Sequence, residues 1–317
     1  MADRTALLER PQPPRPSGPG TLALPLGLLK TARPRQWVKN VLVVAAPAAA
    51  GELFSRHSLT QLPLVFALFT AAASAVYLIN DARDADADRA HPTKCRRPVA
   101  AGQVPVAVAY AVGGLLAVLA PVAAAAFCTP LTAGLISAYV VMQLAYCVSL
   151  KHILVVDLAV VTTGFLMRAM IGGVALGIPL SRWFLITTGF GALFMVSAKR
   201  YSEAVQMSGS SEKLGATRAL LTEYTTGYLR FVWQLAAGVA VLAYCLWAME
   251  SGGTADGGSL PWRQLSMAAF VLAVLRYAVF ADRGTAGEPE DVVLRDRALA
   301  VIGLVWIAMY ALAVADL

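Results

Sequence analysis

The fold class is decided by an apolar stretch that runs without a break into a cluster of charged residues. It reads LTQLPLVFALFTAAASAVYLIND over residues 59–81 and continues as ARDADADRAHPTKCRRP over residues 82–98. The apolar part has the length of about 20 residues that a helix needs to cross the hydrocarbon of a membrane. The sequence therefore predicts a transmembrane helix that ends in a polar site at one membrane surface.

Eight further apolar stretches lie along the chain of 317 residues, so we expect nine transmembrane helices in all. The predicted helices cover residues 38–55, 59–81, 104–126, 131–150, 153–176, 183–198, 230–249, 262–280 and 297–315. Hydrophobic residues make up 58% of the chain and charged residues only 14%, whereas a soluble domain carries about 25% charged residues. Because this apolar excess must face lipid, we predict an all-α, polytopic membrane protein that resides in the lipid bilayer.

Residues 1–20 differ in composition from the rest of the chain. They hold three arginines, and prolines and glycines take the place of an apolar segment. Such a segment has too little apolar surface to offset the entropy lost on ordering. We expect a disordered tail over residues 1–20 and one transmembrane domain over residues 21–317. The sequence leaves open whether the chain forms a homo-oligomer.

Lysine and arginine residues are distributed unequally between the two sides of the predicted bundle. If the N-terminus is cytoplasmic, the segments on that side carry 21 of the 26 Lys and Arg residues, and the opposite side carries 3. Such residues collect on the cytoplasmic side of membrane proteins. We therefore predict a multi-pass protein of the bacterial inner membrane with its polar site facing the cytoplasm. The net charge of +7 then reflects orientation and an anion site, not nucleic-acid binding.

The polar residues at the end of the opening stretch recur at helical spacing. Asn80, Asp84 and Asp88 follow one another at intervals of four residues, so they share one helix face. Oxygen ligands without histidine or thiolate suit Mg²⁺, which takes one or two carboxylates together with substrate phosphate oxygens. We predict a magnesium site at Asn80 and Asp84 and a catalytic role for both residues and for Asp88. Two further residues adjoin this face as predicted substrate contacts, Tyr77 and Asp81.

An alternative interpretation is a solvated acidic helix end at the membrane surface. It accounts for Asp86, which points away from the shared face. It does not account for a polar stripe that begins inside an apolar helix, where ionisable groups are costly. Lys94, Arg96 and Arg97 follow closely and can bind phosphate oxygens, arginine through paired hydrogen bonds. The stretch therefore predicts a site for a magnesium diphosphate.

The motif N-D-x-x-D-x-x-x-D followed by R-P resembles the first aspartate motif of the UbiA-type intramembrane prenyltransferase superfamily. Members of that superfamily are nine-helix bundles. Four other stretches resemble one branch of it, which transfers phosphoribose. They are RPRQWVKN at 33–40, AYCVSLKH at 145–152, FMVSAKRYSE at 194–203 and GEPEDVVLRDR at 287–297.

The resemblance implies a UbiA-like catalytic domain and a particular reaction. In this branch, Mg²⁺-dependent transfer joins the 5-phosphoribose of 5-phosphoribose 1-diphosphate (PRPP) to a polyprenyl phosphate of decaprenyl type, and pyrophosphate leaves. The product is a precursor of cell-wall arabinan. The resemblance therefore implies a phosphoribosyltransferase, with PRPP and a polyprenyl phosphate as its binding partners.

The sequence departs from the superfamily pattern at the end of the sixth predicted helix. A second aspartate motif is usual there, whereas this chain has Lys199 and Arg200, with Glu203 as the nearby acid. Two cations in place of two carboxylates favour a substrate with an additional phosphate, such as the 5-phosphate of PRPP. The alternative is that both cations only mark the cytoplasmic end of a helix. We predict substrate contacts at Lys199, Arg200 and Glu203.

Four other charged or polar residues are predicted to contact substrate, each with a structural alternative. Lys39 is a phosphate ligand or an interfacial anchor, and the pair Lys151 and His152 binds phosphate or only closes a turn. Arg168 lies within an apolar helix, as does Asp157, where ions are costly and often functional. Either residue could instead anchor helix packing.

Two other functions remain open from the residues alone. A UbiA-type enzyme could transfer a polyprenyl diphosphate to an aromatic acceptor, although it would ordinarily use the second carboxylate pair. A polytopic transporter would explain the helices but not a row of metal and phosphate ligands.

Overall fold

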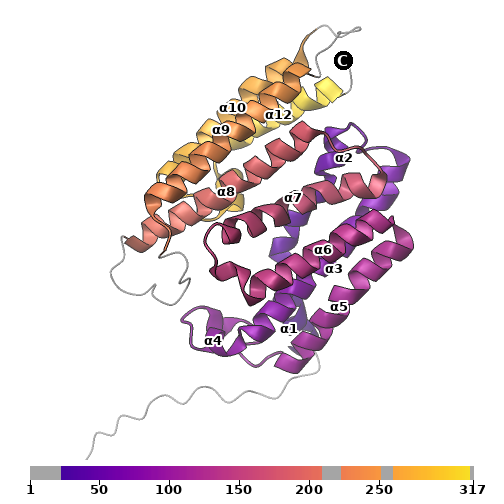
Figure 1. Cartoon of the computed structure of the whole chain (residues 1–317), viewed down its shortest axis with the longest axis vertical. Helices are drawn as coiled ribbons and strands as arrows, with labels where there is room; N and C mark the ends of the chain where they lie inside the picture. Colours follow the sequence, from indigo (N-terminus) through magenta and orange to yellow (C-terminus); the bar gives the residue numbers. More distant parts are fainter. Residues whose placement is uncertain (1–22, 209–222, 251–259, 315–317) are drawn as a thin grey trace, which may run out of the picture.

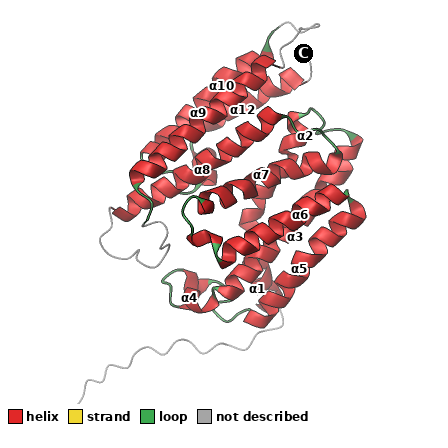
Figure 2. Ribbon diagram, viewed as in Figure 1, coloured by secondary structure: helices red, strands yellow, loops and turns green. Residues whose placement is uncertain are grey.

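Every regular element in the described part of the chain is a helix. The computed structural model describes residues 23–208, 223–250 and 260–314, and no strand occurs within these ranges (Figure 2). The predicted all-α class is therefore confirmed. The tail predicted over residues 1–20 lies outside the described residues.

Within these ranges the bundle consists of eight long helices and several short ones (Figure 1). The long helices are α3 (Arg56–Arg83), α5 (Val106–Phe127), α6 (Pro130–Val148), α7 (Val156–Leu176), α8 (Arg182–Ser208), α9 (Thr226–Glu250), α10 (Trp262–Asp282) and α12 (Arg297–Val314). The short α-helices are α1 (Ala23–Thr31), α2 (Ala45–Ala49), α4 (Ala85–Arg89) and α11 (Pro289–Arg295). Three segments are 3₁₀ helices, η1 (Pro34–Val44), η2 (Lys94–Arg96) and η3 (Leu150–His152).

Among the described residues, seven helices are long and apolar enough to cross a membrane, namely α3, α5, α6, α7, α9, α10 and α12. The predicted count of nine is therefore not confirmed for the part of the chain that the structure describes. The predicted first span, 38–55, lies in η1, the short α2 and the turn after it. The other difference is α8, whose apolar part over 183–198 is shorter than the about 20 residues of a full span.

Buried residues form two main groups that meet at α7. One group joins α8, α9 and α10, and the other joins α3, α5 and α6. Leu158 near the start of α7 belongs to the first group, and Ile171 near its end belongs to the second. In Figure 1, α7 accordingly lies between α8 and α6. The turn that precedes α7 therefore lies at the border between the two halves of the bundle.

The 3₁₀ helix η1 packs directly on the backbone of α7. A side-chain carbon at Gly172 would lie 1.9 Å from the carbonyl oxygen of Val43, so only glycine permits this approach. The amide of Asn40 is also buried and donates to the hydroxyl of Thr70 on α3 at 3.0 Å. These contacts fix η1 against both α3 and α7.

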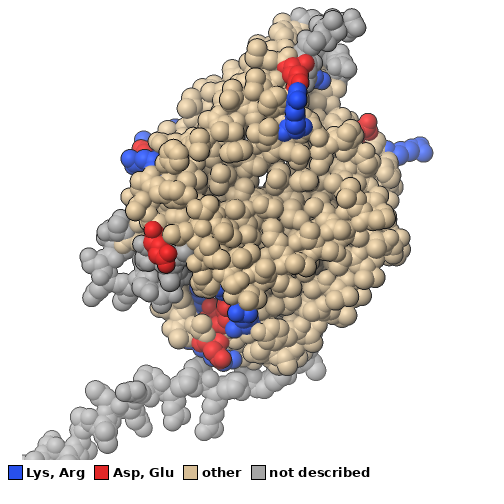
Figure 3. Space-filling model, viewed as in Figure 1, with Lys and Arg blue, Asp and Glu red and all other residues tan. Residues whose placement is uncertain are grey.

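The exterior of the bundle is largely apolar. Leu131 and Val141 on α6, Val118 on α5 and Leu304 on α12 each expose more than half of their surface. In the space-filling view, the broad centre of the visible face has no charged atoms, and charged side chains lie around its margins (Figure 3). This pattern is that of a protein whose middle faces lipid and whose polar residues lie at the membrane surfaces.

Candidate active site

The junction of α3 and α4 carries the predicted magnesium ligands. Asp84 ends α3 and begins α4, with backbone angles of φ −88° and ψ 7°. The helical hydrogen bonds nevertheless continue through it, because Asp84 N–H donates to Asn80 at 2.9 Å and Asp88 N–H donates to Asp84 at 2.8 Å. Asn80, Asp84 and Asp88 therefore occupy successive helical turns, as their spacing predicts.

Two of the three α3–α4 aspartates (Asp81, Asp84 and Asp88) are buried and paired with arginine. Arg97 Nη1 lies 3.2 Å from Asp81 Oδ1 and 2.7 Å from Asp88 Oδ2. Arg33 Nη2 lies 2.6 Å from the same Asp81 oxygen, and its guanidinium stacks over the ring of Tyr77 at 4.7 Å. Asp81 and Asp88 are 2% and 4% exposed, so these arginines compensate carboxylates that water does not solvate.

Asp84 differs from its two neighbours in exposure and pairing. Its side chain is 28% exposed, and its carboxylate oxygens lie 3.4 and 3.5 Å from Lys151 Nζ, a long and weak contact. The side chain of Asn80 forms no hydrogen bond within the described ranges. Asp86 is 96% exposed and pairs with Arg89, so it points away from the site as its spacing predicts.

The residues at this junction fit a magnesium ion that substrate phosphates help to hold. Asp81 and Asp88 are engaged by arginine, whereas the oxygens of Asn80 and Asp84 remain available as ligands. Where the chain is described, no group of three or more His, Cys, Asp or Glu side chains could hold a metal by itself. Such a sparse oxygen set excludes a structural zinc site, and it suits Mg²⁺, which keeps waters and binds phosphate oxygens.

Three 3₁₀ helices surround the α3–α4 aspartates with cations. Arg33 immediately precedes η1, Arg97 immediately follows η2, and Lys151 lies on η3. Three other predicted phosphate ligands lie on the same segments, Lys39 and Lys94, which are half-buried, and His152, which is exposed. Segments far apart in the sequence therefore bring three aspartates and at least three cations to one place.

The predicted ligand Arg200 is engaged by carboxylates of the protein itself. Its Nε and Nη2 lie 3.1 and 3.2 Å from the two oxygens of Asp157, and its Nη1 lies 3.2 Å from Glu203. Tyr146 donates to Asp157 at 2.5 Å. Burial raises the pKa of Glu203, and the neighbouring cations Arg200 and Lys199 partly oppose that rise. Arg200 is thus fixed in a buried network, and its charge is compensated without substrate.

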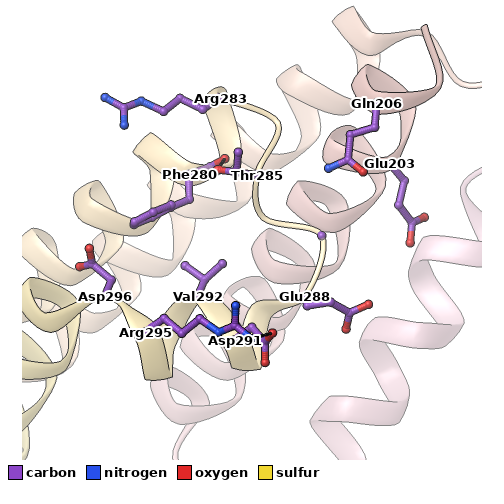
Figure 4. Close-up of a pocket in the computed structure, with 11 residues that line it drawn as sticks. Glu203, Gln206, Phe280, Arg283, Thr285, Glu288, Asp291, Val292, Arg295 and Asp296 are labelled. Carbon is purple, nitrogen blue, oxygen red and sulfur yellow. Dashed lines mark hydrogen bonds and ion pairs between the residues drawn. The ribbon is translucent and has the colours of Figure 1, made fainter. Parts of the chain in front are cut away.

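Lys199 is more accessible than Arg200. Its Nζ lies 3.2 Å from Glu288, and their side chains are 27% and 65% exposed. Glu203 and Glu288 line a cavity of about 720 Å³ between α8, α10 and α11 (Figure 4). None of the α3–α4 aspartates lines this cavity, so the geometry separates it from the metal ligands.

Arg168 is buried in the middle of the bundle, where neutral groups hold it. Its three nitrogens donate to Asn40 Oδ1 at 3.0 Å, the Gly164 carbonyl at 2.8 Å and the Tyr139 hydroxyl at 2.7 Å. No carboxylate lies within ion-pair distance of it among the residues described. Phe69 and Tyr139 face the guanidinium at 5.5 and 5.1 Å. These contacts tie η1 to α6 and α7.

Sequence reasoning missed two residues that organise the site, Arg33 and Asn40. Both belong to the stretch RPRQWVKN, from which only Lys39 was predicted as a ligand. Arg33 has positive φ, at 56°, which turns the chain between α1 and η1. The stretch was itself a signal that its residues are functional. It could not identify their partners Asp81 and Arg168, which lie 48 and 128 residues away in the chain.

The chain belongs to the UbiA prenyltransferase family, which it matches over residues 41–295. Within that family it is similar to decaprenyl-phosphate phosphoribosyltransferase of Mycobacterium tuberculosis (strain H37Rv), with 51% identity over 91% of this chain and 94% of that protein. The protein of the same description from Mycolicibacterium smegmatis is 46% identical over 98% of this chain and 99% of its own length.

Solved structures share the fold at low sequence identity. A UbiA homologue from Archaeoglobus fulgidus bound to GPP and Mg²⁺ has a TM-score of 0.64 and 15% identity, covering 92% of this chain and 100% of that one. A digeranylgeranylglyceryl phosphate synthase has a TM-score of 0.64 and 14% identity, covering 92% and 99%. The predicted UbiA-like bundle is therefore confirmed as the fold.

Proposed function

We propose that this chain transfers 5-phosphoribose from PRPP to decaprenyl phosphate, with release of pyrophosphate, for synthesis of arabinan precursors. The observation that carries the proposal is its 46–51% identity, over most of its length, to proteins described as decaprenyl-phosphate phosphoribosyltransferases. The site supports it, because available oxygen ligands and several cations surround one place at the end of α3. Residues 21–317 form one catalytic domain in this proposal, and the family match over 41–295 supports that extent.

The residues of the chain bind and orient the diphosphate. Mg²⁺ held by Asn80 and Asp84 would offset the charge that builds on the leaving pyrophosphate. Lys151, now at a long distance from Asp84, turns its ammonium toward the same phosphates, and Lys94 adds a second cation. Arg97 keeps Asp88 and the α4 segment in place. These groups act at the bond that breaks, between C1 of ribose and the pyrophosphate oxygen.

The new bond forms at the opposite face of ribose C1. An oxygen of the lipid phosphate attacks C1 while the electron pair of the breaking bond leaves with pyrophosphate. The lipid phosphate is already an anion at neutral pH, so no general base is needed. The product is therefore a phosphoribosyl lipid with inverted, β configuration at C1.

The decisive experiment incubates purified protein and Mg²⁺ with decaprenyl phosphate and PRPP labelled in the ribose. We expect lipid-soluble label that disappears when Mg²⁺ is chelated. A parallel reaction replaces both substrates by a polyprenyl diphosphate and a labelled aromatic acceptor, which tests the other UbiA-type activity. Label in the lipid phase only from the second reaction would overturn the proposed function.

Lys199 is our candidate for the sugar 5-phosphate, because its partly exposed pair with Glu288 can open whereas Arg200 is held by two carboxylates. Lys199→Met keeps the apolar stem and removes one charge-assisted contact, worth about 1.5–3 kcal/mol. We expect a loss of about 10- to 150-fold in kcat/KM with PRPP. A donor without the 5-phosphate should react poorly with both proteins and lose little more in the variant. Equal losses with both donors would show that Lys199 does not contact this phosphate.

We also propose that the site faces the cytoplasm of a bacterium from the inner membrane. The support is the excess of Lys and Arg on the side of the α3–α4 junction. A cysteine introduced at position 90, which is exposed beside the site, should react with an impermeant maleimide only after the membrane is opened. Reaction in intact cells would reverse the proposed orientation.

A further inference from the structure

The turn between α6 and α7 has a strained backbone beside the site. Val155, the residue before α7, has φ 68° and ψ −43°, close to the classic γ-turn conformation that is rare and strained. For a β-branched residue, positive φ is a genuine outlier. The same turn carries Lys151, whose ammonium lies beside Asp84. Its conformation therefore determines where a cation of the site lies.

A single side chain from the other half of the bundle holds this strained residue. The backbone N–H of Val155 donates to the hydroxyl of Tyr224 at 2.7 Å. Val155 is 54% exposed, so its own packing does not compensate the strain. Strained backbone persists only where surrounding contacts impose it, and the hydrogen bond that the Tyr224 hydroxyl accepts from Val155 N–H is such a contact.

Tyr224 is itself rigidly placed. It is 7% exposed, belongs to the same buried group as Leu158 at the start of α7, and stacks on Tyr228 with ring planes 12° apart. Burial raises the pKa of its phenol, so the hydroxyl stays neutral at physiological pH. Tyr224 lies just before α9, 69 residues from Val155 along the chain. It therefore links the half of the bundle that contains α9 to the turn that carries Lys151.

We propose that Tyr224 is a positioning residue for phosphoribosyl transfer, which keeps the strained turn in the conformation that places Lys151 beside Asp84. This inference rests on the proposed function, since it assigns Lys151 to the pyrophosphate. Tyr224 contacts neither Lys151 nor Asp84 in the described structure and acts only through the backbone of Val155. Its loss should lower turnover without removing any ligand of the substrate.

The test combines Tyr224→Phe with Val155→Gly, alone and together. Phenylalanine keeps the buried ring and removes only the hydroxyl, so we expect kcat to fall about 3- to 10-fold, as for one lost hydrogen bond. Glycine adopts positive φ without steric cost, so Val155→Gly alone should stay near the parent rate. We call the hydrogen bond from Val155 N–H to the Tyr224 hydroxyl the tether. In the double variant the turn no longer needs the tether, and kcat should return toward the parent value.

Tyr228→Phe is the matched control. It removes the hydroxyl of the ring that stacks on Tyr224, and this hydroxyl forms no hydrogen bond within the described ranges. An equal loss in that variant, or no rescue by Val155→Gly, overturns the proposal, because a general loss of packing would give both results. Hydrogen exchange at the Val155 amide, measured without substrate, should accelerate in Tyr224→Phe. If it does not, the tether is absent. Failure of the parent enzyme to use PRPP would instead overturn the proposed function. Hydrogen exchange at the Val155 amide would still test whether the tether exists, because it needs no substrate.

Discussion

Asp84→Ala is expected to reduce phosphoribosyl transfer by about 1,000-fold or more. Asp84 is the α3–α4 aspartate that is partly exposed and has only a long contact to a cation, so its oxygens are the ones available to a metal. Without this metal ligand, the negative charge that builds on the leaving pyrophosphate is not compensated. A loss of about 4 kcal/mol of transition-state stabilisation corresponds to a rate about 1,000-fold lower. Initial rates with labelled PRPP and decaprenyl phosphate measure it.

Asp86→Ala is the matched control for Asp84→Ala, two residues away on the same short segment. Asp86 is 96% exposed and pairs with Arg89, so its removal should change the rate by less than about twofold, as for other exposed ion pairs. Raising the Mg²⁺ concentration should recover part of the Asp84→Ala loss and leave Asp86→Ala unchanged. Equal losses at both positions would contradict the assignment of Asp84 as a metal ligand.

The contrast between Asp84 and Asp86 was predictable because it depends on local helical geometry. Residues four apart share a helix face and residues two apart do not, and this rule holds across the boundary between α3 and α4 at Asp84. Long apolar runs were equally informative, since the stretch 59–81 lies within α3. Both predictions use only interactions between residues close in sequence.

The partners of the charged residues could not be predicted in the same way. Asp157 pairs with Arg200 across 43 residues, and nothing in either local pattern identifies the other. This pairing changes the interpretation of Arg200 from an available phosphate ligand to a compensated, buried cation. The sequence gives the charge of a side chain, but the fold determines whether that charge is already satisfied.

The first predicted span illustrates a second limit. Residues 38–55 are apolar enough to suggest a membrane helix, yet they contain η1 and α2. The cause is tertiary, since η1 packs against α7 at Gly172 and its Asn40 bonds to Thr70 and Arg168. The composition of a segment indicates whether it lies in an apolar environment. It does not reveal the tertiary contacts that decide which helices the segment forms.

Arg97→Met is expected to reduce both stability and turnover. Arg97 Nη1 bonds to Asp81 and Asp88 together, and breaking a buried ion pair by removing one partner costs about 3–5 kcal/mol. The lower value is appropriate, because Arg97 is 28% exposed. Asp81 keeps Arg33, so the uncompensated charge falls on Asp88. Thermal unfolding in detergent and initial rates measure the two effects.

Arg96→Met provides the matched control, since Arg96 is the preceding residue, has the same charge and is exposed. It should retain nearly the parent stability. Asp88→Asn in the Arg97→Met background removes the uncompensated carboxylate, so it should recover part of the lost melting temperature. It should not recover the rate if Asp88 also has the predicted catalytic role. Similar losses in Arg96→Met and Arg97→Met, or no thermal recovery in the double variant, would mean that the Arg97–Asp88 pair does not hold the α4 segment in place.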